Sequence, residues 1–133
     1  MQHDGSSYPE DFLRIAKRDL ERVSQLLHAR DPAAAGFYLQ QTVEKHLKAF
    51  LLRNGWKLKR IHDLETLLEA AMEYDGAFET YRSACQTISA LYMAERYPTL
   101  TIYAPDEEDV RELLKSERGL LEALSARAEG SGD

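Results

Sequence analysis

Four polar side chains recur along residues 41–48 at intervals of three and four. They are Gln41, Glu44, Lys45 and Lys48. In an α-helix this spacing puts an amide, a carboxylate and two ammonium groups on one face. Lysines hold phosphate as point charges, and an amide and a carboxylate can address the edges of a base or a ribose. This polar strip is therefore either a groove for a ligand or partner, or a solvent face with a helix-stabilising Glu44–Lys48 ion pair.

The polar strip is followed by a basic segment that contains Trp56, the one tryptophan of the sequence. The cations of this segment are Arg53, Lys57, Lys59 and Arg60. A cation beside an aromatic ring can grip phosphate and stack a base, but Trp56 could equally close the end of a bundle. His62 directly precedes a predicted helix. There it could contact a phosphate with help from the helix dipole, or anchor the turn.

Charge is distributed unevenly along the 133 residues. Residues 36–62 carry a net charge of +5, whereas the other residues carry −11, which gives −6 for the chain. The overall negative charge argues against a protein that coats DNA, because such proteins are strongly basic. A basic middle on an acidic body can still attract a local anion, although the alternative is a solvated loop whose lysines aid solubility.

The elements that must position these groups are helices. Proline and glycine breakers divide the chain into runs with a period near 3.6, which predict helices over residues 9–29, 32–53, 63–74, 77–95 and 106–127. In the second of these, apolar residues from Leu39 to Phe50 lie opposite the polar strip, with His46 at their edge. Short connections make consecutive helices antiparallel neighbours. The sequence therefore predicts an all-α, antiparallel up-down helical bundle of about five helices.

Capping residues support these helix boundaries. Asp31 precedes Pro32 and Asp63 precedes the third helix, as N-caps do. The acidic run 106–109 fits the first turn of a helix, where the dipole favours negative charge, better than a metal site. Cys85 is the one cysteine of the sequence and lies in an apolar helical pattern. It is expected to be a buried, inert thiol, and a disulfide framework is excluded.

The length fits one domain, which we expect over residues 9–127, between flexible ends at 1–8 and 128–133. A run of 18 apolar residues does not occur, so we expect no membrane span. The first residues lack the apolar region of a signal peptide, which makes the cytoplasm the expected location.

Three elements together resemble the HEPN domains, the higher-eukaryote and prokaryote nucleotide-binding domains. These elements are the helix Phe37–Leu52 with its Gln-Gln-x-x-Glu-Lys-x-x-Lys-Ala pattern, the triplet His62-Asp63-Leu64, and Arg96-Tyr97-Pro98. The resemblance covers about residues 9–127. It implies a bundle of about five helices that is usually dimeric. Many short stand-alone members form a two-component complex with a small nucleotidyltransferase, and some of these pairs are toxin–antitoxin systems.

Several HEPN proteins are metal-independent ribonucleases with an arginine, a polar residue, a few further positions and then a histidine. Here Arg96 is followed by Tyr97, and no histidine follows it anywhere in the chain. The dipeptide Arg53-Asn54 fits, but His62 lies nine positions after Arg53, outside the usual window. The sequence therefore favours a non-catalytic module over the alternative, a ribonuclease toxin with an atypical pair such as Arg53 with His62.

We predict a nucleotide- or phosphate-binding module that needs no cofactor or metal and acts as a homodimer with a small nucleotidyltransferase. The predicted ligand-binding residues are Gln41, Glu44, Lys45, Lys48, His62 and Arg96. Tyr92 and Tyr97 are predicted to anchor a partner interface, as exposed aromatic residues often do. Two alternatives stay open: a pure protein-interaction bundle, and a structural Arg96 that bonds carbonyls at its helix end.

Overall fold

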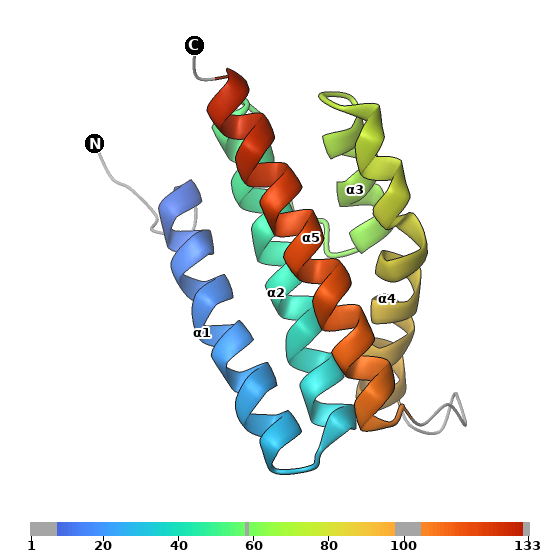
Figure 1. Ribbon diagram of the computed structural model, residues 1–133. Helices are drawn as coiled ribbons and strands as arrows, with labels where there is room; N and C mark the ends of the chain where they lie inside the picture. The colour runs from blue at the N-terminus through green and yellow to red at the C-terminus, as the bar shows by residue number, and fades with distance from the viewer. Residues whose placement is uncertain (1–7, 58, 98–104, 132–133) are drawn as a thin grey trace.

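The computed structural model of the protein describes residues 8–57, 59–97 and 105–131 (Figure 1). In these ranges it contains helices and no strand, so the predicted all-α fold is confirmed. The helices are α1 (Pro9–His28), α2 (Pro32–Arg53), α3 (Leu64–Met72), the 3₁₀ helix η2 (Gly76–Tyr81), α4 (Arg82–Arg96) and α5 (Glu107–Ser131). Within the same ranges, none of these helices combines the length and apolar character needed to cross a bilayer.

The central element of the bundle is α2, which contacts α1, α3, α4 and α5. The long helices α1, α2, α4 and α5 run alternately up and down, and α3 lies beside one end of them (Figure 1). The predicted hairpin of the first two helices is present, and its turn contains Arg30 with a φ of 63°. Because α2 is surrounded, its polar side faces other helices as well as solvent.

Hydrogen bonds at the helix starts agree with the predicted caps. The Asp31 side chain accepts from the Ala34 amide over 3.2 Å, and Asp63 accepts from the Thr66 amide over 3.3 Å. The acidic run before α5 is a reciprocal cap, in which the amide and carboxylate of Asp106 pair with those of Asp109. These side chains accept from amides that a helix N-terminus leaves unpaired.

The fourth predicted helix, 77–95, is in fact η2 followed by α4. Phe78 in η2 is buried edge-on against Phe50, with 5.5 Å between the ring centroids. Arg82, where α4 begins, holds Glu65 of α3 through a 3.1 Å ion pair. Contacts to α2 and α3 thus fix this segment, whereas the sequence period alone suggested one continuous helix. The helix α5 also continues past its predicted end at residue 127.

The core lies where α2 meets its neighbours, and Leu39, Leu47, Leu51, Leu64, Leu67, Leu68, Ile88 and Leu91 are buried in it. Gly36 allows the close approach of α2 to α4, because a Cβ atom there would lie 3.0 Å from Cδ1 of Leu91. Cys85 is 1% exposed, and burial raises the pKa of its thiol to about 12. The predicted burial of this cysteine is therefore confirmed, and a raised pKa is what an inert thiol would have.

Candidate functional site

The polar strip of α2 is not a solvent face. Glu44 is 3% exposed and Lys48 is 4% exposed, and Nζ of Lys48 lies 2.9 Å from Oε2 of Glu44. The solvent-face alternative of an exposed, helix-stabilising pair is wrong, because the helices around α2 cover this turn. A buried ion pair has given up the hydration of both charges, so each partner depends on the other.

Glu44 also holds the chain between α2 and α3. Its Oε2 atom accepts from Nδ1 of His62 over 2.9 Å, and its Oε1 atom accepts from Nε2 of Gln40 over 3.2 Å. The same Gln40 nitrogen donates to the backbone carbonyl of His62 over 3.3 Å. Gln40 and Glu44 together fix the position of His62. Gln40 lies one turn before Glu44 on α2, but its spacing did not single it out, because its second partner is the backbone of His62, 22 residues away in the sequence.

Electrostatics around Glu44 favour its ionised form. Burial by itself would raise its pKa, but the hydrogen bond from His62 and the charges of Lys45 and Lys48 outweigh burial. The pKa of Glu44 therefore lies below its ordinary value. Asp19 on α1 behaves in the opposite way, because burial raises its pKa more than the nearby Lys45 lowers it.

An open cleft of about 290 Å³ lies between α2, α4 and the chain before α3. Its lining residues are Phe37, Gln41, Glu44, Lys45, His62, Tyr92 and Arg96. Five of the six predicted ligand-binding residues line this one cleft, although they come from three separate parts of the chain. The sixth, Lys48, does not line it and is instead the buried partner of Glu44. Tyr92, predicted as a partner anchor, also lines the cleft, whereas Tyr97 does not.

His62 is held at one nitrogen and open at its tip. Its side chain is 72% exposed, although Nδ1 contacts the buried carboxylate of Glu44. An ionised carboxylate accepts a hydrogen bond, so in the neutral ring Nδ1 carries the proton and Nε2 is an acceptor. The imidazole thus enters the cleft with a defined tautomer and orientation.

Arg96 lines the same cleft from the last turn of α4. Its Nε atom donates to the Tyr97 hydroxyl over 3.3 Å. Its guanidinium carbon lies 5.8 Å from the centroid of the Tyr92 ring and 5.9 Å from that of Tyr97. These contacts are cation–π interactions at an exposed position, so the guanidinium keeps its hydrogen-bonding edge available.

Trp56 lies away from this cleft. It is half-buried and packs against the core, as the bundle-closing alternative expects. Nζ of Lys59 lies 5.4 Å from its ring centroid, and both residues line a different cleft together with Glu69 and Glu73. The tryptophan and the phosphate-binding candidates are therefore not brought together.

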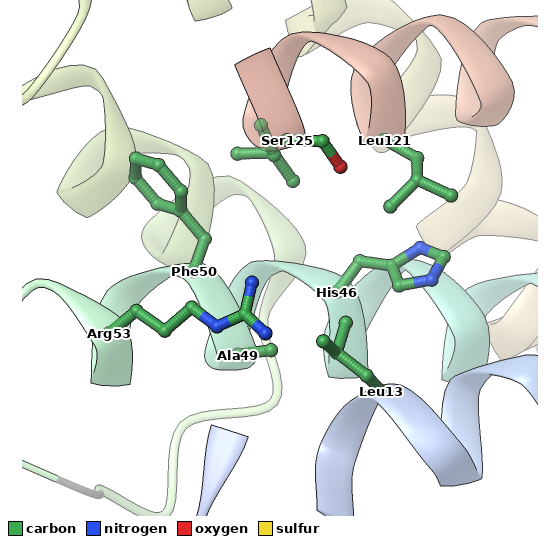
Figure 2. A pocket seen from close by; sticks show the side chains of 8 residues that line it. Leu13, His46, Ala49, Phe50, Arg53, Leu121 and Ser125 are labelled. Atoms are coloured by element: carbon green, nitrogen blue, oxygen red, sulfur yellow. The ribbon is translucent and has the colours of Figure 1, made fainter. Parts of the chain in front are cut away.

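Arg53 borders another cavity, shown in Figure 2, which lies between α1, α2 and α5. Leu13, His46 and Ser125 border the same space, whose volume of about 20 Å³ suits a single water molecule. Arg53 and His62, the pair named for the ribonuclease alternative, therefore line two different cavities.

A second buried polar pair links α2 to α5. Nδ1 of His46 lies 2.5 Å from Oε1 of Glu117, whose side chain is 1% exposed. The other carboxylate oxygen of Glu117 is buried and has no hydrogen-bond partner in the described part of the chain. The sequence pattern placed His46 at the edge of the apolar stripe. It gave no signal for Glu117, because α5 contains many charged residues and most of them are exposed to solvent.

This geometry defines a class of protein: an all-α bundle with a polar cleft between its central helix, α2, and α4. The HEPN domain family model matches residues 9–127, and the chain therefore belongs to the HEPN domain family. The search of curated proteins and the search of solved structures gave no match. The resemblance drawn from the second helix, the His-Asp-Leu triplet and the Arg-Tyr-Pro element is thereby confirmed.

Proposed function

We propose that this HEPN protein is a non-catalytic module that binds the phosphate of a nucleotide in the cleft between α2 and α4. The observation that carries the proposal is the convergence of Lys45, His62 and Arg96 on one open cleft. Lys45 and Arg96 carry a positive charge at neutral pH and can donate hydrogen bonds to phosphate oxygens, and His62 can donate from Nε2 when its ring is doubly protonated.

The charge balance inside the cleft supports an anionic ligand. Glu44 is the acidic residue in the lining, and its charge is matched by the buried Lys48 that contacts it. Lys45 lies farther from the same carboxylate, at 3.8 Å, with 17% of its side chain exposed. Lys45 is thus the ammonium group that a ligand can reach, and an anion there meets an excess of positive charge.

The partner part of the proposal is a homodimer that pairs with a small nucleotidyltransferase, in the manner of a toxin–antitoxin pair. Support comes from the exposed end of α4, where Met93 is 46% exposed and Tyr97 is 42% exposed beside Arg96. Exposed aromatic and arginine side chains are enriched at protein interfaces. Light scattering of the purified chain, and co-purification with a nucleotidyltransferase encoded beside it, test the two halves separately.

Titration calorimetry with pyrophosphate and ATP tests the ligand part. We expect both to bind, and we expect Lys45→Met to weaken binding about tenfold or more, because a charge-assisted hydrogen bond is lost. Lys115→Met is the matched control, since Lys115 is an exposed lysine of α5 outside the cleft lining. The absence of heat with either ligand, or equal losses in the two variants, would remove the ligand-binding proposal.

Metal-independent ribonuclease activity is the second candidate function, and the orientation of His62 by Glu44 favours it. In that reaction Nε2 of His62 would accept the proton of a 2′-hydroxyl as its oxygen bonds to phosphorus, and Arg96 would stabilise charge on the phosphorane oxygens. The P–O5′ bond would then break, and the 5′-oxygen would leave with a proton from water or from the protonated His62. The pair would then be His62 with Arg96, not His62 with Arg53. A fluorescent RNA substrate in the presence of EDTA decides between the candidates. Cleavage that disappears in His62→Ala supports the enzyme, and intact RNA supports the binding module.

A further inference from the structure

A second open cleft adjoins the phosphate cleft. It has a volume of about 270 Å³ and is lined by Ala34, Phe37, Tyr38 and Arg96. Phe37 and Arg96 also line the phosphate cleft, so the two spaces share a wall. The small side chain of Ala34, on the first turn of α2, leaves room beside the aromatic rings.

Aromatic rings and arginine guanidinium groups lie in and around the wall of this second cleft. Phe37 lies parallel to Tyr92, with 5.2 Å between centroids and 16° between planes, and meets Tyr38 edge-on. The guanidinium carbon of Arg22 lies 5.2 Å from the centroid of the Tyr38 ring. Among the residues that the structure describes, the lining contains no carboxylate, in contrast to the phosphate cleft with its Glu44. Flat aromatic rings beside arginine are the surfaces on which nucleobases stack.

We propose that this second cleft holds the base of the nucleotide whose phosphate occupies the first cleft. The inference rests on the proposed function, because it assumes a phosphate beside Lys45. Arg96 stands at the junction of the two clefts and can contact the phosphate with its edge while its plane packs on the base. The two adjoining spaces together suit a nucleoside phosphate, and the polar cleft alone suits a phosphate without a base.

The aromatic rings also pack α2 against α4, but that role does not account for the open space next to them. The stacked pair Phe37–Tyr92 joins the two helices, whereas Tyr38 and Ala34 border the cleft on the α2 side. Ala34 is thus the position at which the cleft can be closed without disturbing the stacked pair.

The test compares ADP, ribose 5-diphosphate and pyrophosphate by titration calorimetry. For the wild-type chain we expect ADP to bind roughly ten- to a hundredfold more tightly than ribose 5-diphosphate, because the two ligands carry the same phosphates and base stacking is lost in the sugar diphosphate. Ala34→Leu fills the second cleft and should abolish this preference while leaving pyrophosphate binding unchanged. Ala126→Leu, at an exposed position of α5, is the matched control, and thermal melting checks that each variant folds.

The possible results separate the base cleft from the phosphate cleft. Equal affinity for ADP and ribose 5-diphosphate, with pyrophosphate still bound, overturns the base cleft and leaves the phosphate cleft standing. A failure of all three ligands to bind overturns both. Persistence of the ADP preference in Ala34→Leu also overturns the base cleft. A short oligoadenylate distinguishes the two sources of a base. If it binds more tightly than ADP and depends on Ala34, the ligand is RNA, and the reverse order assigns a free nucleotide.

Discussion

Glu44 and Lys48 lie one helical turn apart on α2 and form an ion pair of 2.9 Å with both side chains buried. The carboxylate of Glu44 also accepts a hydrogen bond from Nδ1 of His62, which lies before α3. A charge pair inside the bundle thus positions a side chain that is itself exposed to the cleft. The stability of the fold and the geometry of the candidate site therefore depend on the same carboxylate.

Removal of one member of this pair should destabilise the protein strongly. For Lys48→Met we expect a loss of about 3 to 5 kcal/mol in the free energy of unfolding, because Glu44 would remain buried without its main counter-charge. Lys115→Met is the control, since its pair with Glu112 is exposed, and it should change stability by less than about 1 kcal/mol. Urea unfolding measures both. Equal losses in the two variants would contradict the buried pair.

Acid should weaken the fold through Glu44. Its folded-state pKa lies below the ordinary value of 4.5, because the hydrogen bond from His62 and the charges of Lys45 and Lys48 outweigh burial. The carboxylate therefore stabilises the fold fully above that ordinary value, and this contribution disappears as the pH falls through the lower folded pKa. Urea midpoints measured from about pH 6 to about pH 3 should fall more steeply for the wild type than for Glu44→Gln. Parallel pH profiles would refute the assignment.

Asp19 should have the opposite effect. Burial raises its pKa, so the folded state binds its proton more tightly than the unfolded state, and the ionised form opposes folding at neutral pH. We expect Asp19→Asn to raise the urea midpoint near pH 7, and the gain should vanish as the pH falls toward the ordinary value of 3.8. A lower midpoint at neutral pH would show instead that attraction between Asp19 and Lys45 dominates.

Asp19→Asn should also strengthen the binding of pyrophosphate, because it removes a negative charge that acts on Lys45. Calorimetry at two ionic strengths checks this, since the gain should be smaller at high salt. Asp11→Asn, in the first turn of α1, serves as the control, because the partner of Asp11 is Arg14 and not a cleft residue.

The helices were predictable because their apolar residues repeat with one period and their ends carry strong capping residues. Asp31 and Asp63 fixed two starts from local chemistry alone. The division between η2 and α4 was not predictable, because it depends on Arg82 holding residues of α3 that are distant in sequence. A period of 3.6 carries no information about such contacts.

The candidate site was partly predictable for the same reason. Gln41, Glu44 and Lys45 share a helix face, so their spacing brings them together. His62 and Arg96 join them through tertiary structure. The place of His62 directly before a helix pointed to that residue, and the family resemblance pointed to both. Gln40 was missed because its role is a hydrogen bond to the backbone of His62, and Lys48 was assigned to the ligand although burial pairs it with Glu44.

Removing one member of the His46–Glu117 pair should destabilise the protein, whereas replacing both members by apolar residues should not. His46→Leu alone leaves a buried carboxylate without its 2.5 Å partner, and we expect a loss of about 3 kcal/mol or more in the free energy of unfolding. The double variant His46→Leu with Glu117→Leu replaces both polar groups by apolar ones, and it should recover most of the loss or exceed the wild type. A double-mutant cycle by urea unfolding gives the coupling energy. Additive losses would mean that the two side chains do not interact, and that the carboxylate of Glu117 meets a different group between α2 and α5.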